Sequence, residues 1–116
     1  EPGFAAYSAS KAGLIAFAKV LAKEVAPAVR VNVVAPGLVL TPFLAGGTGS
    51  GAAPSSVSVS DWFGSPERGQ AMRDAVPLKR IAEPDDIVAP IFFLLGSGAR
   101  FITGQTLHIN GGRYLS

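Results

Sequence analysis

The sequence predicts an α/β fold built on a parallel sheet. From Tyr7 to about Ala26, apolar residues recur at three- and four-residue spacing without an internal proline, which predicts a helix. The run VRVNVVAPG (residues 29–37) follows and is rich in β-branched residues, which is typical of a strand buried on both faces. A helix that leads directly into such a strand favours parallel α/β topology.

A glycine- and serine-rich stretch separates these elements from the second half of the chain. Residues 46–60 (GGTGSGAAPSSVSVS) contain almost nothing that could enter a core and are expected to be flexible. Ser65 then predicts the start of a short helix, because Pro66 would occupy its first position. This helix is expected to end near Ala75, since Pro77 follows closely.

A further helix and a final strand complete the predicted elements. The segment EPDDIVAPIFFLLGSG (residues 83–98) predicts a helix whose positive N-terminus is stabilised by Asp85 and Asp86 and whose end is marked by glycine. Pro90 lies inside this helix and is expected to kink it, because proline lacks an amide donor. Residues 104–111 contain enough β-forming residues to predict the last strand.

The composition predicts one packed domain with a buried core and excludes several classes of protein. Of the 116 residues 48% are hydrophobic and 16% are charged, which argues against disorder. Ten basic and eight acidic residues are scattered without a basic run, so no nucleic-acid partner is expected. The longest apolar run, residues 87–96, is too short to cross a bilayer, so no membrane partner is expected either. Without cysteine, and with His108 as the single histidine, no metal site is expected and the protein is assigned to the cytoplasm.

The stretch YSASKAG (residues 7–13) places Tyr7 four residues before Lys11. Residues at this spacing share one face of a helix, with their Cβ atoms about 6 Å apart. A phenol has a pKa of about 10, and a neighbouring ammonium lowers it by stabilising the phenolate, so the phenol could exchange a proton with a substrate. Taken alone the pair favours the polar face of an ordinary helix, because tyrosine and lysine at helical spacing are commonplace.

The series of segments after this pair resembles one enzyme family. A helix of small residues, a strand ending RVNVVAPG, a threonine at Thr41, a glycine-rich stretch and finally PLKRIAEPDDIVAPIFFLLGSGARFITGQTLHINGG (residues 77–112) follow in order. This order resembles the C-terminal half of the short-chain dehydrogenase/reductase family, from its Tyr-x-x-x-Lys helix to its end. The resemblance implies that residues 1–116 are the C-terminal part of a Rossmann-type, doubly wound parallel sheet.

The resemblance assigns catalytic roles to the pair. The family tyrosine, which matches Tyr7, is the general acid-base. The family lysine, which matches Lys11, holds the nicotinamide ribose hydroxyls and lowers the pKa of the tyrosine. Asn32 matches an asparagine of the family strand and is expected to satisfy nearby backbone groups, since a buried strand amide usually does so.

The resemblance also implies a contact segment for the cofactor. The family turn after the strand matches Pro36 and Gly37, where the backbone lies against the nicotinamide ring. Val39 is expected to meet the carboxamide through its main-chain amide and carbonyl, and Thr41 through its hydroxyl.

Residues 43–76 match the substrate-binding flap of the family. Leu44, Trp62 and Phe63 are the flap residues expected to meet a substrate. A disordered linker whose aromatic residues only anchor the next helix is the alternative reading. The closing segment of the family usually reads Val-Asp-Gly-Gly, so Ile109 and Asn110 are departures, and any contact made by the aspartate carboxylate is in doubt here.

Parts of the family site have no match in this sequence. No glycine-rich dinucleotide turn follows a strand, and only six residues precede Tyr7, whereas the family serine lies about a dozen residues before its tyrosine. The chain is therefore expected to need the missing N-terminal half of the same protein as a partner and to be inactive alone. The family also commonly forms homodimers or homotetramers.

The resemblance implies an oxidoreductase that uses NAD or NADP to interconvert a secondary alcohol and a ketone by hydride transfer. A 3-oxoacyl-carrier-protein reductase is the most common activity of such sequences. Two alternatives stay open at this point, a non-catalytic fragment that serves as an assembly module and an epimerase or dehydratase relative. The residues that would select NAD or NADP are absent from the sequence.

Overall fold

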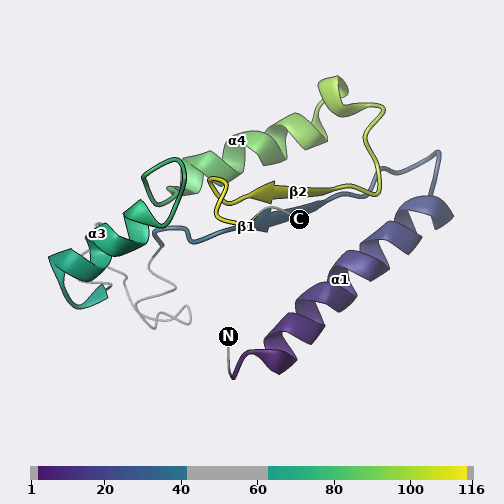
Figure 1. Ribbon diagram of the computed structural model, residues 1–116. Helices are drawn as coiled ribbons and strands as arrows, with labels where there is room; N and C mark the ends of the chain where they lie inside the picture. The colour runs from purple at the N-terminus through teal and green to yellow at the C-terminus, as the bar shows by residue number, and fades with distance from the viewer. Residues whose placement is uncertain (1–2, 42–62, 115–116) are drawn as a thin grey trace, which may run out of the picture. The chain divides into compact units, whose positions relative to one another are not determined.

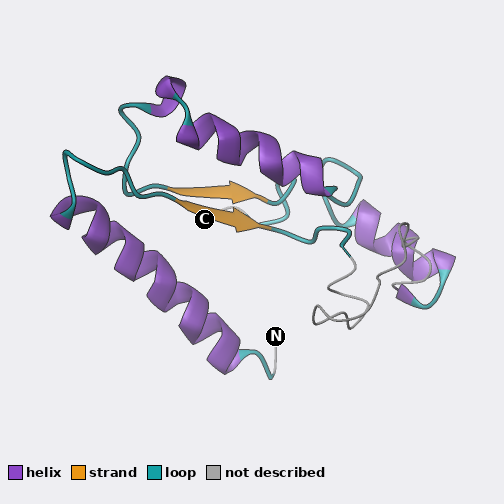
Figure 2. Ribbon diagram, turned by 180° about the vertical axis from the view of Figure 1, so that it is seen from behind, coloured by secondary structure: helices purple, strands orange, loops and turns teal. Residues whose placement is uncertain are grey.

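A computed structural model of the chain describes residues 3–41 and 63–114 (Figure 1). Along the chain the described elements are α1 (Ala5–Glu24), β1 (Val33–Pro36), α3 (Pro66–Asp74), α4 (Pro84–Leu95), the 3-10 helix η2 (Ser97–Ala99) and β2 (Thr106–Ile109). The strands β1 and β2 form a two-stranded sheet and run in the same direction (Figure 2). The Val33 amide donates to the Gln105 carbonyl, and the Gly37 amide donates to the Ile109 carbonyl four residues further along both strands. The expected α/β class with a parallel sheet is confirmed.

The chain divides into two compact units. The first unit comprises Glu1–Ala35 and Pro90–His108, and the second comprises Pro36–Ala89 and Ile109–Ser116. The first therefore holds α1 and the end of α4, whereas the second holds α3 and the start of α4.

The interior of the first unit is built from alanine. Ala18, Ala22 and Ala99 are buried there, and a Cβ at Gly104 would lie 3.6 Å from the Cβ of Ala22, so α1 approaches the backbone before β2 closely. Within this unit, α1 and the last turn of α4 lie on opposite sides of the strands (Figure 1). Many large apolar side chains of this unit are exposed, Phe101 fully, and others such as Leu21 and Ile102 are half-buried. The expected core is present but thin, because its side chains are small.

Two polar side chains just before β1, those of Arg30 and Asn32, join distant parts of the first unit. The Arg30 guanidinium donates to the carbonyl of Leu94 at the end of α4 (2.7 Å) and to that of Ile102 (3.1 Å). The Asn32 amide donates to the Ile102 carbonyl (2.9 Å), and its oxygen accepts from the Gln105 amide (3.1 Å). The expected structural role of Asn32 is confirmed, since both halves of its side chain satisfy backbone groups.

In the second unit the predicted helix start is confirmed in detail. The Ser65 hydroxyl accepts from the Arg68 amide (3.3 Å) and caps α3, which has Pro66 at its first position. The loop after α3 buries Val76 and Ile81 and then forms a parallel bridge to Val39.

One local expectation differs from the structure. The predicted strand was expected to be buried on both faces, but β1 has four residues, of which three are half-buried and Pro36 is exposed. Among the described residues β1 pairs with β2 alone, and the buried side chains of the first unit are small alanines, so the faces of β1 are only partly covered. Pro90 lies inside α4, which continues to Leu95 as expected, and the kink at Pro90 stays a prediction. No helix in the described ranges is both long and apolar enough to cross a membrane.

Candidate active site

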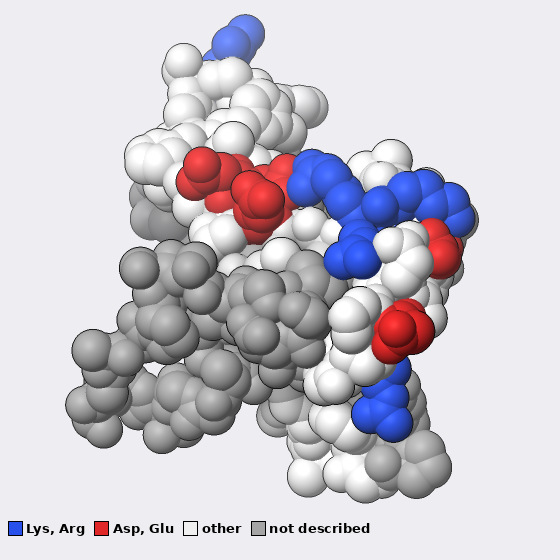
Figure 3. All heavy atoms as spheres, turned by 90° about the vertical axis from the view of Figure 1, so that its left-hand side faces the viewer, with Lys and Arg blue, Asp and Glu red and all other residues white. Residues whose placement is uncertain are grey.

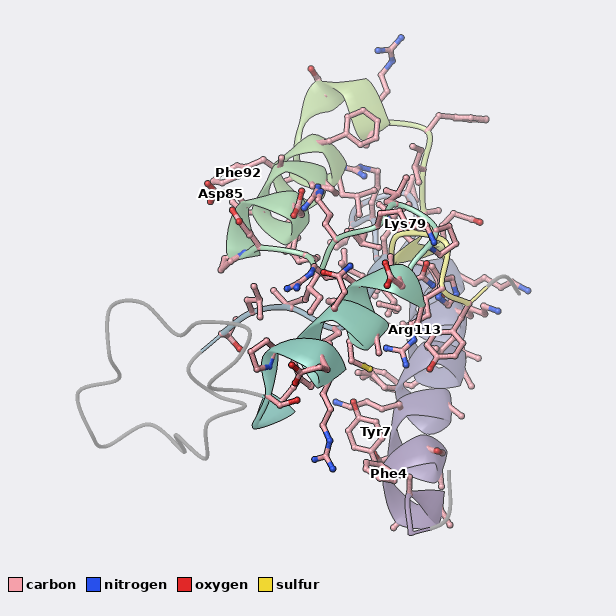
Figure 4. All side chains as sticks on the ribbon, turned by 60° about the vertical axis from the view of Figure 1, so that its left-hand side comes forward. Phe4, Tyr7, Lys79, Asp85, Phe92 and Arg113 are labelled. Atoms are coloured by element: carbon pink, nitrogen blue, oxygen red, sulfur yellow. The ribbon has the colours of Figure 1, made fainter. Side chains whose placement is uncertain are left out.

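Tyr7 lies in the first turn of α1, where the helix presents it to solvent. Its side chain is 60% exposed and its ring packs edge-on against Phe4 with a centroid distance of 6.1 Å (Figure 4). No described residue hydrogen-bonds to the Tyr7 hydroxyl, and the Ser10 hydroxyl bonds to its main-chain carbonyl instead (2.7 Å). Since none of the described residues occupies the phenol oxygen, it is accessible to a ligand.

Lys11 lies one turn further along α1 and folds back over Tyr7. Its Nζ is 5.3 Å from the centroid of the Tyr7 ring, within the range of a cation–π contact. This proximity follows from the helix itself, because residues four apart lie on the same face. The structure thus places the predicted pair together on one accessible surface, with a positive charge beside the phenol.

The remaining cofactor residues predicted from the sequence lie in the second unit, at the end of β1. The Gly37 amide donates to the Ile109 carbonyl (2.8 Å). A Cβ at Gly37 would lie 3.0 Å from both the Cα and the Cβ of Asn110, closer than an ordinary van der Waals contact. A side chain at this position would require the Asn110 backbone to move by a few tenths of an ångström, so the structure gives Gly37 a packing reason that the sequence did not reveal.

Val39 has main-chain groups that suit a planar amide ligand. Val39 and Ala82 form a parallel bridge. Its hydrogen bond comes from the residue after Val39, because the Leu40 amide donates to the Ala82 carbonyl (2.9 Å). In a parallel ladder the amide and carbonyl of the central residue point away from that partner. One donor and one acceptor are the groups that a carboxamide requires, so Val39 fits the nicotinamide implied by the resemblance. Thr41, two residues further on, is half-buried.

The predicted flap is described only in part. Leu44 and Trp62 lie outside the described residues, as do residues 43–61 as a whole. Phe63 is half-buried just before α3, and α3 occupies most of the described part of the flap. The proposed contacts of these residues with a substrate therefore stay a prediction.

An ion pair fixes the start of α4. The Arg80 guanidinium donates two hydrogen bonds to the Asp86 carboxylate (2.5 and 2.6 Å), which also accepts from the Glu83 amide (2.8 Å). The hydrogen bonds from Arg80 hold the pKa of Asp86 well below its usual value, with the Glu83 amide adding to the effect. The same contact raises the pKa of Arg80. Figure 3 shows acidic side chains (red) next to basic side chains (blue) on one face of the molecule. The expected helix-start role is confirmed for Asp86.

Sequence reasoning missed the packing of the C-terminal turn. Asn110 was identified only as a departure from a family aspartate, yet its backbone and Cβ lie against Gly37. The signal that could have revealed it is the Gly-Gly pair directly after Asn110. Two adjacent glycines often mark a close approach between backbone segments.

Comparisons with known proteins agree with the resemblance. Residues 1–113 match a family model described as enoyl-(acyl carrier protein) reductase. The 3-oxoacyl-[acyl-carrier-protein] reductase FabG of Haemophilus influenzae is 40% identical over 117 residues, which cover 100% of this chain and 41% of that protein. Among solved structures, a short-chain dehydrogenase/reductase from Brucella melitensis superposes with a TM-score of 0.76 at 31% identity, over 97% of this chain and 39% of that one. A 4-hydroxyisoleucine dehydrogenase complexed with NADH superposes with a TM-score of 0.72 at 32% identity, over 94% and 39% of the two chains.

The matched region is a minor part of these relatives. The chain spans about two fifths of the length of the FabG protein and of both solved structures. All the predicted site residues fall within the matched range, including Tyr7, Lys11 and the segment from Pro36 to Thr41.

Proposed function

Because the chain belongs to the short-chain dehydrogenase/reductase family, we propose that the whole protein is an NAD(P)-dependent oxidoreductase that interconverts a secondary alcohol and a ketone. The observation that carries this proposal is the pair on α1. An accessible tyrosine with an ammonium 5.3 Å from its ring centroid is a suitable proton donor and acceptor.

In this mechanism Tyr7 moves the proton and Lys11 supports it. The Tyr7 hydroxyl donates a proton to the ketone oxygen in reduction and accepts one from the alcohol in oxidation. Lys11 lies beside the Tyr7 ring, and the donors of its ammonium suit the ribose hydroxyls of the nucleotide. When bound, the nicotinamide supplies or accepts the hydride.

The second unit would hold the nicotinamide carboxamide. Val39 supplies one main-chain donor and one acceptor, and Thr41 adds a hydroxyl. Pro36 and Gly37 form the turn that presents this segment to the ring. The proposal is supported by the direction of the Val39 groups, which point away from the bridge to Ala82.

The finer assignments belong to the same proposal. The domain is the C-terminal part of a doubly wound Rossmann-type sheet, and the flap of residues 43–76 covers the substrate through Leu44, Trp62 and Phe63. A 3-oxoacyl thioester is the favoured substrate class, because the relative from H. influenzae bears that name. The whole protein is assigned to the cytoplasm as a homodimer or homotetramer, with NAD or NADP as cofactor.

The test uses the full-length protein with Tyr7→Phe. Titration with NADH and NADPH, followed by nucleotide fluorescence, is expected to show unchanged binding, whereas turnover of a 3-oxoacyl thioester falls by at least about 100-fold because the proton donor is lost. Tyr114→Phe is the matched control, because Tyr114 is also exposed (64%) and also lies beside a cation, with the Arg113 guanidinium 5.5 Å from its ring. This control should change turnover by no more than about twofold.

Other outcomes identify the alternatives. A full-length protein that binds neither nucleotide would favour the non-catalytic assembly module. Nucleotide binding with substrate conversion but no net change in the reduced nucleotide would indicate an epimerase or a dehydratase. Unchanged turnover in Tyr7→Phe would remove Tyr7 from the mechanism.

A further inference from the structure

We propose that the turn Asn110–Gly112 is a positioning element that sets the backbone of the cofactor segment Pro36–Val39. Asn110 acts through Gly37 and does not touch the reacting atoms. The consequence for nucleotide binding rests on the function proposed above, but the positioning itself does not. The case is built entirely from contacts within the second unit.

The first contact fixes the distance between the turn and the cofactor segment. A Cβ at Gly37 would lie 3.0 Å from the Cα and the Cβ of Asn110, so the two backbones are already as close as a glycine allows. The hydrogen bond from the Gly37 amide to the Ile109 carbonyl (2.8 Å) sets their register. A shift of Asn110 would therefore shift Gly37 and the residues that follow it.

The opposite side of the turn rests on the loop after α3. The Leu78 amide donates to the Gly111 carbonyl (3.2 Å). A Cβ at Gly111 would lie 2.5 Å from Cγ1 of the buried Val76, and a Cβ at Gly112 would lie 3.2 Å from Pro77. Both glycines have positive φ (+63° and +85°), so a side chain at either would also be strained. The turn is thus wedged between the cofactor segment and the loop that continues from the predicted flap.

The side chain of Asn110 holds the turn in this shape. Its oxygen accepts from the Gly112 amide (2.9 Å), and its nitrogen donates to the Tyr114 carbonyl (2.8 Å). A cavity of about 140 Å³ lies beside the turn, lined in part by Leu38 and Leu78. These two side-chain hydrogen bonds act together with the backbone bond from the Arg113 amide to the Asn110 carbonyl (3.1 Å) and restrain the turn on the side where the cavity leaves it without packing. The aspartate of the family pattern could accept the first bond but, when ionised, could not donate the second.

The first unit supplies a matched control. Asn32 also donates one hydrogen bond to a carbonyl (Ile102) and accepts one from an amide (Gln105), and it is half-buried like Asn110. Replacing either asparagine removes the same two kinds of bond. Only Asn110 lies against the cofactor segment.

The experiment compares Asn110→Leu, Asn110→Asp and Asn32→Leu in the full-length protein. Hydrogen exchange without nucleotide is measured by mass spectrometry for peptides covering residues 36–41, and the dissociation constant for NADH or NADPH is measured by fluorescence titration. Asn110→Leu is expected to speed exchange in residues 36–41 and to weaken nucleotide binding by about tenfold, because the turn loses both restraints. Asn32→Leu should change both quantities by no more than about twofold. Asn110→Asp keeps the bond from Gly112 and should lie closer to the wild type than to Asn110→Leu.

The outcomes separate this inference from the proposed function. Exchange in residues 36–41 that is the same in Asn110→Leu and the wild type, or that Asn32→Leu speeds equally, would overturn the positioning role. If the wild type binds no nucleotide, the proposed function fails while the exchange comparison still decides the role of the turn. If Asn110→Leu does not fold, Asn110→Ser and Asn32→Ser are compared instead. Exchange in residues 36–41 should again be faster in the Asn110 variant than in the Asn32 variant, and equal exchange in the two would overturn the positioning role.

Discussion

Replacing Gly37 with alanine should destabilise the protein more than replacing a glycine whose new Cβ would meet a movable side chain at a similar distance. The new Cβ would lie 3.0 Å from the Cα and Cβ of Asn110, whereas ordinary contacts lie at 3.4–4 Å. The neighbouring atoms belong to or adjoin a backbone that is held on its other side by Val76 and Pro77. Relief therefore requires main-chain movement of several tenths of an ångström, and overpacking of this kind costs about 1–3 kcal/mol.

Gly98→Ala is the matched control for this prediction. A Cβ at Gly98 would lie 3.2 Å from the ring of Phe93, which is 52% exposed and can turn away. Its cost should stay within about 0.5 kcal/mol. Urea unfolding of both variants in the full-length protein, at one protein concentration, should lower the midpoint by about 1 M for Gly37→Ala and very little for Gly98→Ala. Equal midpoints for the two variants would refute the argument that Asn110 cannot yield.

Two further predictions concern the second unit. Asp86 has a lowered pKa in the folded protein, so its stabilising contribution is complete above the unfolded value of 3.8 and is lost as the pH falls below it. The melting temperature of the wild type should therefore exceed that of Asp86→Asn by the full amount at pH 7, and the difference should begin to shrink as the pH falls below 3.8 and keep shrinking towards the lower folded pKa; a difference that stays constant below pH 3.8 would contradict the role of the Arg80 pair. Lys79 has a φ of +57°, and its ammonium donates to the Asp74 carbonyl (2.8 Å). Lys79→Gly and Lys79→Ala both lose that bond, but the glycine variant should be about 1 kcal/mol more stable in urea unfolding, because it alone removes the left-handed strain; equal stabilities would contradict this.

The features that could be predicted from the sequence are those decided by near neighbours. Ser65 and Pro66 specify the start of α3 through an amide three residues away, and the start was predicted correctly. The meeting of Tyr7 and Lys11 was predictable for the same reason, because a single helical turn separates them.

The features that escaped prediction depend on residues distant in the chain. Arg30 bonds to Leu94 across 64 positions, and no local pattern indicates that partner. The length and half-burial of β1 depend on which elements lie beside it and pack over its faces, which its own residues do not specify. Gly37 was predicted as part of a turn whose backbone lies against the nicotinamide ring, and nothing near it in the sequence indicates its neighbour in space, Asn110, near the other end of the sequence.

The alanine interior of the first unit has a consequence for how such a protein can change over time. Methyl groups contribute little apolar area, so the cohesion of this unit depends heavily on directional bonds such as those from Arg30 and Asn32 to Ile102. These hydrogen bonds are insensitive to the replacement of exposed side chains, but they are lost when an insertion or a deletion changes the distance between donor and acceptor. Lineages that carry this architecture should therefore accumulate amino-acid replacements freely on its outer faces, while length changes between residues 25 and 32 or between 96 and 104 should be rare.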